Sequence, residues 1–343
     1  MRFLCRTGIS RLVVTSCAVL CGFASSAAAQ AFIPEPGQAV VSVSYQSVRT
    51  HGQHGVTGKW FSNAAQVDRL GDDKTESHAV IWYVEYGLAK RIAVHASLPY
   101  VQGRYEGPIP HTEGFDGQPS NLDDGTYHGS FQDFYVGTRF KLLESSRFAL
   151  TPFVEVIIPS HQYESLAQTA VGRDLRALVV GAAAGGFADF LPGLHFQTRA
   201  SYAFVERAVD IRPNRIGIDS SVGYFVTPRL AIQFIETFQL TRDGIDFIGA
   251  PELLAVHNGA PMTDEHFRNH DRLTRSNALN FGAGVAFELT NSVGVFATFT
   301  KLAWGKNLPP PRAITVGMNW SVQTRGSGSR ASANGSRSVA SAR

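Results

Sequence analysis

The chain has 343 residues, of which 44% are hydrophobic and only 17% are charged, a low share for a soluble surface. Once the three arginines of the N-terminal leader are set aside, 28 basic residues stand against 28 acidic ones, which excludes an electrostatic nucleic-acid-binding protein. Beyond the leader, no run of about 18 apolar residues occurs, which excludes a helical membrane span. A membrane protein of this composition has to be a closed barrel, because lipid cannot satisfy the backbone groups of an open sheet edge.

Residues 1–29 have the pattern of a cleaved export signal. Three arginines between positions 2 and 11 precede a mostly apolar stretch at 12–24, and alanines at 27–29 form a signal-peptidase site. We place the cut after Ala29. Cleavage before Cys21, as in a lipoprotein, is the alternative, but the bulky Leu20 stands where small residues are normal. All three cysteines lie inside the signal, so we expect an exported chain without disulfides or thiols.

Twelve segments of the exported chain are predicted strands, and nearly all of them alternate apolar and polar residues, as strands with two unlike faces do. The clearest pair lies within 129–160, where two such runs are joined by a polar turn at 144–147. In chain order, the segments are 39–49, 78–86, 92–100, the two runs within 129–160, 176–187, 194–205, 215–226, 230–240, 278–289, 293–302 and 313–322.

The connections between these segments alternate in length, with long or moderate loops after the odd segments and tight turns after the even ones. This alternation is typical of outer-membrane barrels, which have short periplasmic turns and longer extracellular loops. The sequence therefore predicts an all-β fold over 30–322, a transmembrane antiparallel up-and-down β-barrel of about 12 strands in the cell outer membrane of a Gram-negative bacterium. A soluble β-sandwich is the alternative, but its outward strand faces would be polar.

The surroundings of such a barrel follow from the same reasoning. We expect outer-membrane lipids and the barrel-assembly machinery as its partners. Barrel proteins commonly end on an aromatic residue that this machinery reads, and Trp320 stands in an internal version of that signal. The segment 323–343, rich in Ser, Arg, Gly and Ala, is expected to be a disordered tail.

Four short motifs lie at the ends of predicted strands, namely Tyr86-Gly87-Leu88, Ala96-Ser97-Leu98-Pro99-Tyr100, Asp133-Phe134-Tyr135-Val136-Gly137 and Ile157-Ile158-Pro159-Ser160. Together they resemble the outer-membrane proteins of the MetA-pathway of phenol degradation family, over about 80–322. The resemblance implies a barrel and the passage of aromatic or other hydrophobic compounds. Gln132 and His161 replace glycines of the family pattern, and the chain continues beyond its last strand.

Charged and aromatic residues occupy the strand face that is not apolar, and we expect this face to line the lumen. Opposite charges there either form a salt-bridged plug or line an open pore and set its selectivity. Each residue by itself can also be a mere filler of the lumen. The candidate lumen-lining residues are Glu85, Asp133, Tyr135, Arg139, Lys141, Glu155, Arg176, Arg199, Asp219 and Glu288.

Two residues break the strand pattern. Glu236 falls on the apolar face between Phe234 and Phe238, where an acid is unfavourable, so we expect a bulge, an interfacial position or a contact with another chain. Pro152 lies inside a strand of a closed barrel, which has no free edge to receive it. We expect a bulge or locally broken pairing at Pro152.

We expect no catalytic residue, cofactor or metal ion. The candidate metal ligands are His266 and His270, one helical turn apart and beside acidic residues in the longest predicted loop. An outer-membrane phospholipase is an alternative, because such enzymes also have twelve strands and need a His and a Ser two residues apart, facing lipid. His95 and Ser97 have this spacing but face the predicted lumen, and His128 and Ser130 lie at a loop edge.

These observations predict a passive outer-membrane channel or uptake protein for small, hydrophobic or aromatic solutes. The barrel follows from the residue pattern, and the solute class follows from the family resemblance. The alternative from another class is a structural or adhesive surface barrel, with a plugged lumen and with its function in the loops.

Overall fold

The computed structural model describes residues 31–51, 53–54, 60–61, 74–106, 122–248, 254–261, 263–308 and 310–324. The predicted export signal and all but two residues of the predicted tail at 323–343 lie outside this set. The described chain is almost entirely antiparallel sheet, with two short helices, α3 (Asp264–Arg268) and α4 (His270–Leu273). Among these residues, no helix has both the length and the apolar character needed to cross a bilayer.

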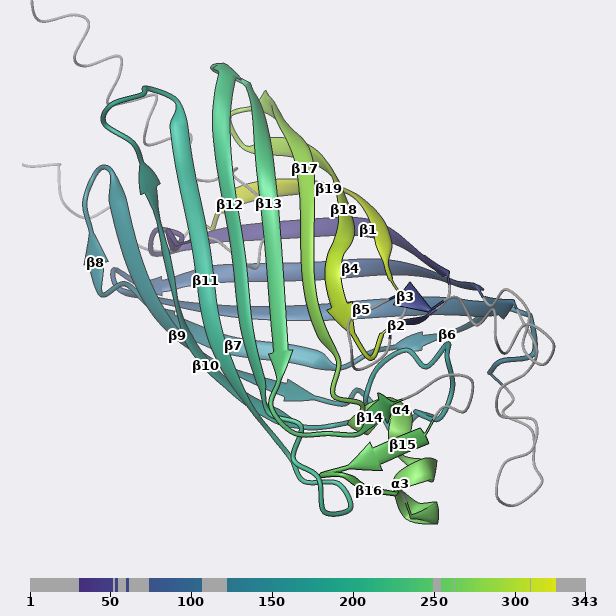
Figure 1. The fold of residues 1–343 in the computed structure, drawn as a ribbon. Coiled ribbons are helices and arrows are strands. Elements are labelled where there is room, and N and C mark those ends of the chain that lie inside the picture. The colour runs from purple at the N-terminus through teal and green to yellow at the C-terminus, as the bar shows by residue number, and fades with distance from the viewer. Residues whose placement is uncertain are drawn as a thin grey trace, which may run out of the picture.

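Twelve strands follow one another around a closed ring, each antiparallel to its neighbours (Figure 1). The first and last strands of the chain, β1 and β19, pair with each other and close the ring. On the opposite side, β9 pairs with β10, so the ring is continuous there as well. The prediction of a twelve-stranded antiparallel barrel is therefore confirmed. In ring order, the strands are β1 (Gln38–His51), β4 (Lys74–Ala89), β5 (Ile92–Glu106), β7 (Phe134–Phe140), β9 (Phe148–Ile158), β10 (Ala177–Phe187), β11 (Leu194–Val205), β12 (Arg215–Thr227), β13 (Leu230–Thr241), β17 (Asn277–Thr290), β18 (Val293–Lys306) and β19 (Arg312–Gln323).

Shorter strands extend the ring or lie in the loops. β6 (His128–Phe131) continues the position of β7 along β5, and β8 (Leu143–Glu144) continues it along β9. The remaining short strands form two separate small sheets, β2 (Gln53–His54) with β3 (Trp60–Phe61), and β14 (Asp246–Ile248) with β15 (Leu254–His257) and β16 (Ala260–Pro261).

Two prolines explain why one predicted strand is divided into β6, β7 and β8. Pro99 in β5 and Pro152 in β9 lack the N–H that a central strand needs for its ladder. Opposite each proline the register shifts by one residue, between β7 and β6 for Pro99 and between β7 and β8 for Pro152. A one-residue bulge of this kind leaves the ladder locally unpaired. The irregularity expected at Pro152 is therefore confirmed.

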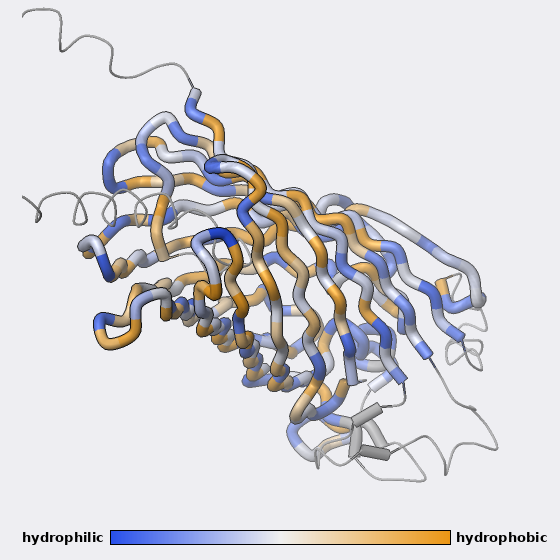
Figure 2. The backbone as a smooth tube through the Cα atoms, turned by 90° about the horizontal axis from the view of Figure 1, so that it is seen from above, coloured by the Kyte–Doolittle hydropathy of each residue, from blue (hydrophilic) through white to orange (hydrophobic). Residues whose placement is uncertain are grey.

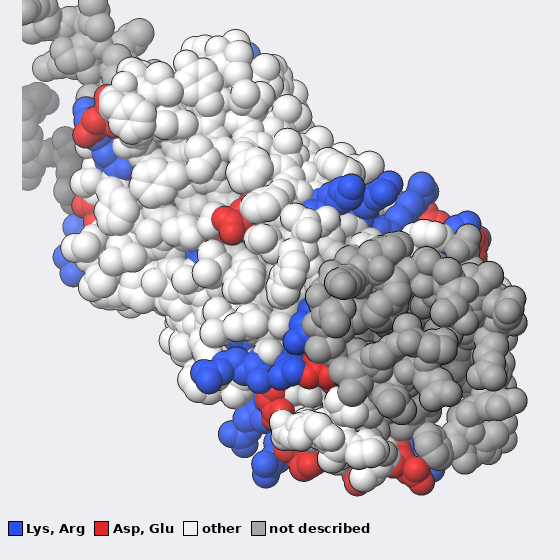
Figure 3. Space-filling view, in the orientation of Figure 1, with Lys and Arg blue, Asp and Glu red and all other residues white. Residues whose placement is uncertain are grey.

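Side chains alternate between an apolar outer face and a mostly polar lumen face. Figure 2 shows this alternation along the strands, and Figure 3 shows a broad, largely uncharged wall with an acidic patch in its middle and with basic and acidic side chains gathered toward its ends. On β9, for example, Val154 is 48% exposed and points outward, whereas Phe153 is 4% exposed and points inward. An uncharged band of this kind matches the lipid-facing belt of an outer-membrane barrel.

Glu236 lies on this outer face, as its register predicts. It is the cross-strand neighbour of Ser220 on β12 and of Phe281 on β17, and the pairing is regular on both sides. The expected bulge is therefore not the explanation of this acid.

The two ends of the barrel differ in the length of the connections between strands. At one end, the short-turn end, adjacent strands are joined by tight turns such as the one between β12 and β13. The other, the long-loop end, carries α3, α4 and the small β14–β15–β16 sheet (Figure 1). Both termini of the described chain lie at the short-turn end, where Thr324 donates from its backbone N–H to the Gly37 carbonyl at 2.8 Å.

Candidate functional site: the lumen

A cavity of about 460 Å³ lies inside the barrel, mainly against β4, β5, β7 and β9. Its lining combines aliphatic, aromatic and ionisable side chains, so it has no single polarity. The aliphatic residues include Ala79, Ile81 and Val101, the aromatic ones are Tyr83, Tyr135 and Phe153, and the ionisable ones are His95, Arg139, Glu155 and Arg199.

A buried ion pair lies behind this lining. Glu85 is fully buried, and Arg139 donates from Nη1 to both of its carboxylate oxygens at 3.0 and 3.1 Å. The hydroxyl of Tyr83 donates to Glu85 Oε2 at 3.1 Å. Arg139 on β7 reaches Glu85 on β4 across β5, where its neighbour is the small Ala93. Because both charges are removed from water, each depends on the other for its stability.

A second group of charges extends the ion pairs toward β12. His95 Nε2 lies 2.9 Å from Glu155 Oε2, and Arg199 Nη2 lies 3.5 Å from Glu155 Oε1. Arg199 also approaches Asp219, with 3.8 Å between Nη1 and Oδ2, and its guanidinium lies 4.2 Å from the centre of the Phe153 ring. Arg199 therefore links two carboxylates and stacks on an aromatic face that lines the cavity.

Glycine at position 137 allows the contact between His95 and Glu155. Gly137 on β7 is the cross-strand neighbour of His95 on one side and of Glu155 on the other. A Cβ atom at Gly137 would lie 2.7 Å from His95 Cε1, closer than real Cβ contacts allow. The missing side chain therefore gives the imidazole the space through which it reaches across β7.

The opposite side of the lumen is built differently. We call the group of ionisable and aromatic residues on β4, β5, β7, β9 and β11 the charged wall, and the lumen face of β13, β17, β18, β19 and β1 the small-residue wall. The small-residue wall is rich in Gly, Ala, Ser and Thr, although it also carries larger side chains such as Gln233, Ile235, Phe296 and Leu302. Its members include Ser42, Ser44, Thr237, Asn280, Gly282, Gly284, Thr298, Thr300, Thr315 and Gly317.

Segments from both ends of the barrel approach the cavity. At the long-loop end, Ala170 and Val171 of the β9–β10 loop form part of its lining. At the short-turn end, Ala31 is fully buried against the barrel, and its carbonyl accepts a hydrogen bond from Thr151 Oγ1 at 2.5 Å. Ala31 also packs with Ala183, a residue of the cavity lining, so the N-terminal segment lies next to the cavity wall.

Eight of the ten predicted lumen residues face the interior, and six of these belong to the charged groups or the cavity lining described above. Asp133 lies in the break between β6 and β7, where it is buried and accepts a hydrogen bond from the Tyr163 hydroxyl at 2.5 Å. Glu288 is buried near the short-turn end. The inward-facing residues are Glu85, Asp133, Tyr135, Arg139, Glu155, Arg199, Asp219 and Glu288.

The other two predicted lumen residues lie elsewhere. Arg176 is exposed just before β10, with the opposite facing to its buried neighbours Leu175 and Ala177, so it does not face the lumen. Lys141 lies in the bulged segment between β7 and β8 at the short-turn end, where its side chain is only 13% exposed, pairs with Glu144 of β8 at 2.5 Å and lies 4.0 Å from Glu35. The bulge changes the alternation on which its predicted facing depended.

The candidate lumen set drawn from the sequence omitted two residues that the structure places inside the barrel, although His95 was expected to face the lumen. His95 alternates with Ala93 and Ser97 on the lumen face, so its position was readable, but its partner Glu155 on a non-adjacent strand was not. Arg173 of the β9–β10 loop donates from Nη2 to Ser276 Oγ at 2.7 Å. A loop has no periodicity, so no sequence signal marked Arg173 as inward-facing.

The two His–Ser pairs considered for a phospholipase have other contacts. His95 directs Nε2 to Glu155 and faces the lumen, as expected, rather than lipid. His128 Nε2 contacts Asp124 Oδ1 at 2.8 Å, and this contact lowers the pKa of the Asp124 carboxyl to about 2, with help from Thr126. The hydroxyl of Ser130 lies 3.0 Å from His161 Nε2.

No family model and no curated protein matches the sequence. Among solved structures, the fold is similar to the COG4313 outer membrane channel from Pseudomonas putida F1, with a TM-score of 0.60 and 12% sequence identity over 87% of this chain and 99% of that chain. Others are the NanC porin (TM-score 0.42, 9% identity, 80% of this chain and 98% of that chain) and the TodX deltaS2S3 mutant monoaromatic hydrocarbon channel (TM-score 0.39, 9% identity, 89% and 94%).

At these identities the first similarity shows the fold, that of an outer-membrane β-barrel. It supports a place in the outer membrane. The more specific family suggested by the sequence motifs remains a prediction.

Proposed function

We propose that this chain is an outer-membrane channel or uptake protein for small, hydrophobic or aromatic solutes. The observation that carries the proposal is the lumen cavity of about 460 Å³, lined in part by aliphatic and aromatic side chains. A cavity of roughly 150 Å³ is enough to bind benzene when its lining is apolar. The similar Pseudomonas protein, itself an outer membrane channel, is consistent with this proposal.

The charges of the lumen fit such a solute because they are paired. Glu85 is neutralised by Arg139, and Glu155 lies between His95 and Arg199. A paired group exerts a weaker field on its surroundings than an isolated charge. The lining therefore offers little attraction to a charged solute, while Tyr135 and Phe153 offer flat apolar surfaces to an aromatic ring.

Two tryptophan substitutions on neighbouring residues of β4 test the proposal. Ala79 lines the cavity, whereas Val80 points outward. In Gram-negative cells that express the protein, we expect faster entry of the hydrophobic probe N-phenyl-1-naphthylamine than in empty-vector cells. Ala79→Trp should remove most of this gain and Val80→Trp should keep it. Equal entry with and without the wild-type protein would contradict the proposal.

The alternative, a structural or adhesive barrel with a plugged lumen, is favoured by one observation. The β9–β10 loop lines the cavity at one end, and Ala31 of segment 31–36 packs against the lining residue Ala183 at the other. Conductance in planar bilayers separates the two functions. A channel should conduct more when residues 31–35 are removed. A barrel that stays closed after this removal, in cells that also show no faster probe entry, supports the structural function.

A further inference from the structure

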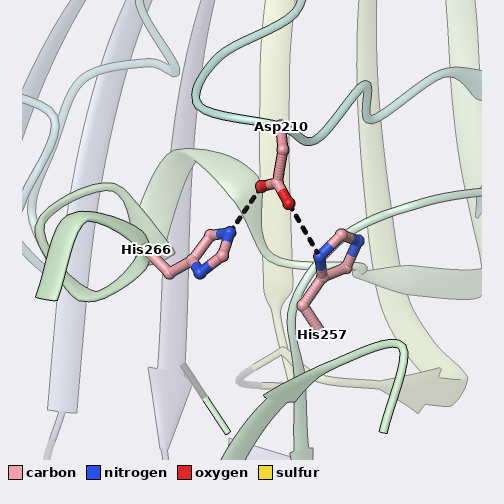
Figure 4. Close-up of side chains that lie close together, drawn as sticks. All are labelled: Asp210, His257 and His266. Carbon is pink, nitrogen blue, oxygen red and sulfur yellow. Dashed lines mark hydrogen bonds and ion pairs between the residues drawn. The ribbon is translucent and has the colours of Figure 1, made fainter. Parts of the chain in front are cut away.

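Three side chains from two different loops meet at the long-loop end of the barrel (Figure 4). Asp210 lies in the β11–β12 loop, His257 ends β15, and His266 lies in α3. One carboxylate oxygen and one ring nitrogen from each histidine all lie within 4.8 Å of one another. Two imidazoles and one carboxylate are a donor set that binds zinc and related divalent metal ions.

The carboxylate lies between the two imidazoles. His266 Nε2 is 2.5 Å from Asp210 Oδ1, and His257 Nδ1 is 3.8 Å from Asp210 Oδ2. Ligands about 2.1 Å from a tetrahedral zinc ion are themselves about 3.4 Å apart. Small side-chain rotations that separate His266 from Asp210 and bring His257 closer would therefore make room for the ion.

The opposite ring nitrogens are already held by other groups. His257 Nε2 lies 3.0 Å from Asp243 Oδ1, and His266 Nδ1 lies 2.9 Å from the Thr263 hydroxyl. Metal-binding histidines characteristically use their second nitrogen in this way, which fixes the orientation of the ring. Each histidine thus presents the nitrogen nearer to Asp210 for coordination.

The surroundings suit a site that an ion can enter. The side chains of His257 and His266 are each only 10% exposed, whereas that of Asp210 is 59% exposed. The turn that carries Asp210 is held by reciprocal backbone hydrogen bonds between Ala208 and Ile211, both 3.0 Å long, and Ile211 is fully buried. The carboxylate therefore stands at a solvent-facing opening on an ordered turn.

We propose that Asp210, His257 and His266 bind one divalent transition-metal ion of the zinc class, with water completing the coordination. The ion ties the β11–β12 loop to the long loop between β13 and β17. The site differs from the pair suggested by sequence, because His270 is directed to Asp271, with 3.2 Å between Nε2 and Oδ1. It also departs from our expectation that the chain binds no metal.

Titration of the tag-free, chelator-stripped protein with Zn²⁺ in detergent, followed by calorimetry, tests the site. We expect one ion per barrel, and a loss of affinity of at least about tenfold in His257→Gln and in His266→Gln. His128→Gln is the matched control, because His128 also contacts an aspartate at the long-loop end but stands outside the site. Heat-dependent gel migration verifies that each variant forms the barrel.

Cobalt provides a second readout, because tetrahedral Co²⁺ with nitrogen and oxygen ligands absorbs visible light. We expect these bands in the wild-type protein and in His128→Gln, and their loss in His266→Gln. Absence of Zn²⁺ binding by the wild-type protein would overturn the proposal. Binding that survives both substitutions, or that is lost equally in the control, would overturn it as well.

A second, independent feature lies on the outer face, where basic residues stand side by side. Lys301 on β18 is the cross-strand neighbour of Arg312 on β19, which is in turn the neighbour of Arg49 on β1. The row continues through Glu76 on β4 to Arg104 on β5. Figure 3 shows basic side chains where the uncharged wall approaches the long-loop end.

Such a row is unfavourable unless an anion joins it, because like charges directly opposite each other repel. Glu76 pairs with Arg49 at 2.8 Å and with Arg104 at 3.3 Å. Within the described part of the chain, no carboxylate is paired with Lys301 or Arg312. Among the described residues, these two neighbouring cations thus have no anionic partner, and they offer a pair of donors to a phosphate.

An apolar groove of about 800 Å³ adjoins these cations. Arg49, Lys301 and Arg312 form its polar side. Phe299, Ile314 and the Pro310–Pro311 segment contribute apolar surface, and Phe299 and Ile314 are about half exposed. The groove thus combines a phosphate-binding edge with a surface for hydrocarbon.

We propose that this groove binds a phosphorylated glycolipid of the lipid A type, with a phosphate on Lys301 and Arg312 and an acyl chain against Phe299 and Ile314. This assignment rests on the outer-membrane location in the proposed function. Glycolipid of this chemistry fills the outer leaflet of that membrane, and the row lies at the long-loop end that we expect to face outward.

Native mass spectrometry of the detergent-purified protein with added bisphosphorylated lipid A tests this site separately from transport. We expect the bound fraction to fall at least about fivefold in the Lys301→Gln, Arg312→Gln double variant. Arg91→Gln, in a turn at the short-turn end, should leave binding unchanged. Dephosphorylated lipid A should bind as poorly as the double variant does. Equal binding by the wild-type protein and the double variant would overturn the assignment, even if the barrel transports solutes.

Discussion

The two walls of the lumen fill the space beside their small residues with different kinds of side chain. On the charged wall, long side chains lie over small neighbours, as His95 does over Gly137 and Arg139 does beside Ala93. On the small-residue wall, the glycines are covered by neighbouring side chains, as Gly317 is by Phe296 and Gly284 is by Thr298. Glycine is therefore common to both walls, and on the charged wall its space lets ionisable side chains meet across an intervening strand.

The interactions that position the cavity lining therefore differ from those that close the ring of strands. The ring is held by antiparallel backbone ladders on both sides, although the ladders of β5 and β9 shift register by one residue opposite Pro99 and Pro152. The position of the cavity-lining side chains depends on buried charges, each of which needs its partner. Substitutions on the charged wall should therefore affect both stability and permeation, whereas those on the small-residue wall should affect stability only when they add bulk.

The largest effect is expected from Glu85→Ala, which leaves Arg139 buried without a partner. Breaking a buried ion pair on one side costs about 3–5 kcal/mol of unfolding free energy. Urea unfolding of the barrel refolded into lipid vesicles measures the loss. The double variant Glu85→Leu, Arg139→Met removes both charges and should recover most of the stability. A loss below about 1 kcal/mol in Glu85→Ala would show that water reaches this pair.

Gly137→Val should have the next largest effect, because the new side chain takes the space through which His95 reaches Glu155. Overpacking of a filled site costs about 1–3 kcal/mol. Gly125 is an exposed loop glycine with a positive φ of 86°, so a valine there would itself strain the backbone and could not serve as the control. Thr138→Val, on the outward face of β7, is the control instead. If both variants unfold at the same urea concentration, the proposed role of Gly137 is wrong.

Arg199→Met should cost less, about 1–2 kcal/mol, because Glu155 keeps His95 as its partner. Its main consequence should appear in permeation. Glu155 and Asp219 lose their shared cation, so the lumen becomes more negative and more selective for cations. Reversal potentials in planar bilayers under a salt gradient measure this shift, and an unchanged reversal potential would place Arg199 outside the ion path.

The smallest effect is expected on the small-residue wall. Thr298→Val keeps the methyl group that lies beside Gly284 and removes only a hydroxyl. The unfolding free energy should change by no more than about 0.5 kcal/mol, and the ion selectivity should not change. A selectivity shift as large as that of Arg199→Met would mean that the two walls contribute equally to the ion path.

The sequence was sufficient for the ring of strands because a barrel strand has two faces with different solvents. Residues such as Val154 and Phe153 alternate with a period of two, and this alternation marked nearly all of the twelve ring strands, although segment 176–187, which became β10, is rich in Gly and Ala instead. Length alternation of the connections then indicated the antiparallel order. The division of one strand into β6, β7 and β8 was not predicted, because the one-residue shifts depend on prolines in the neighbouring strands.

The contacts of the site were harder to predict. Facing follows from period two, so Glu85 and Arg139 were both expected in the lumen. Their pairing crosses an intervening strand and depends on the registers of two ladders, which sequence does not specify. In the same way, the i and i+4 spacing suggested His266 with His270, whereas loop folding brings His266 to Asp210 and His257. Local spacing carries no information about contacts between separate loops.

The hydrogen bond between Thr324 and Gly37 brings the two ends of the described ring together. Because the two ends of the described ring are hydrogen-bonded to each other, a short linker could join them without altering any ladder. A circularly permuted chain, opened instead in the loop between β5 and β6, would keep the same twelve ring positions. It would also move Trp320 from the last strand to the interior of the sequence. Such a permutant would separate the information that folds the barrel from the position of Trp320 in the last strand, which we expect the assembly machinery to read.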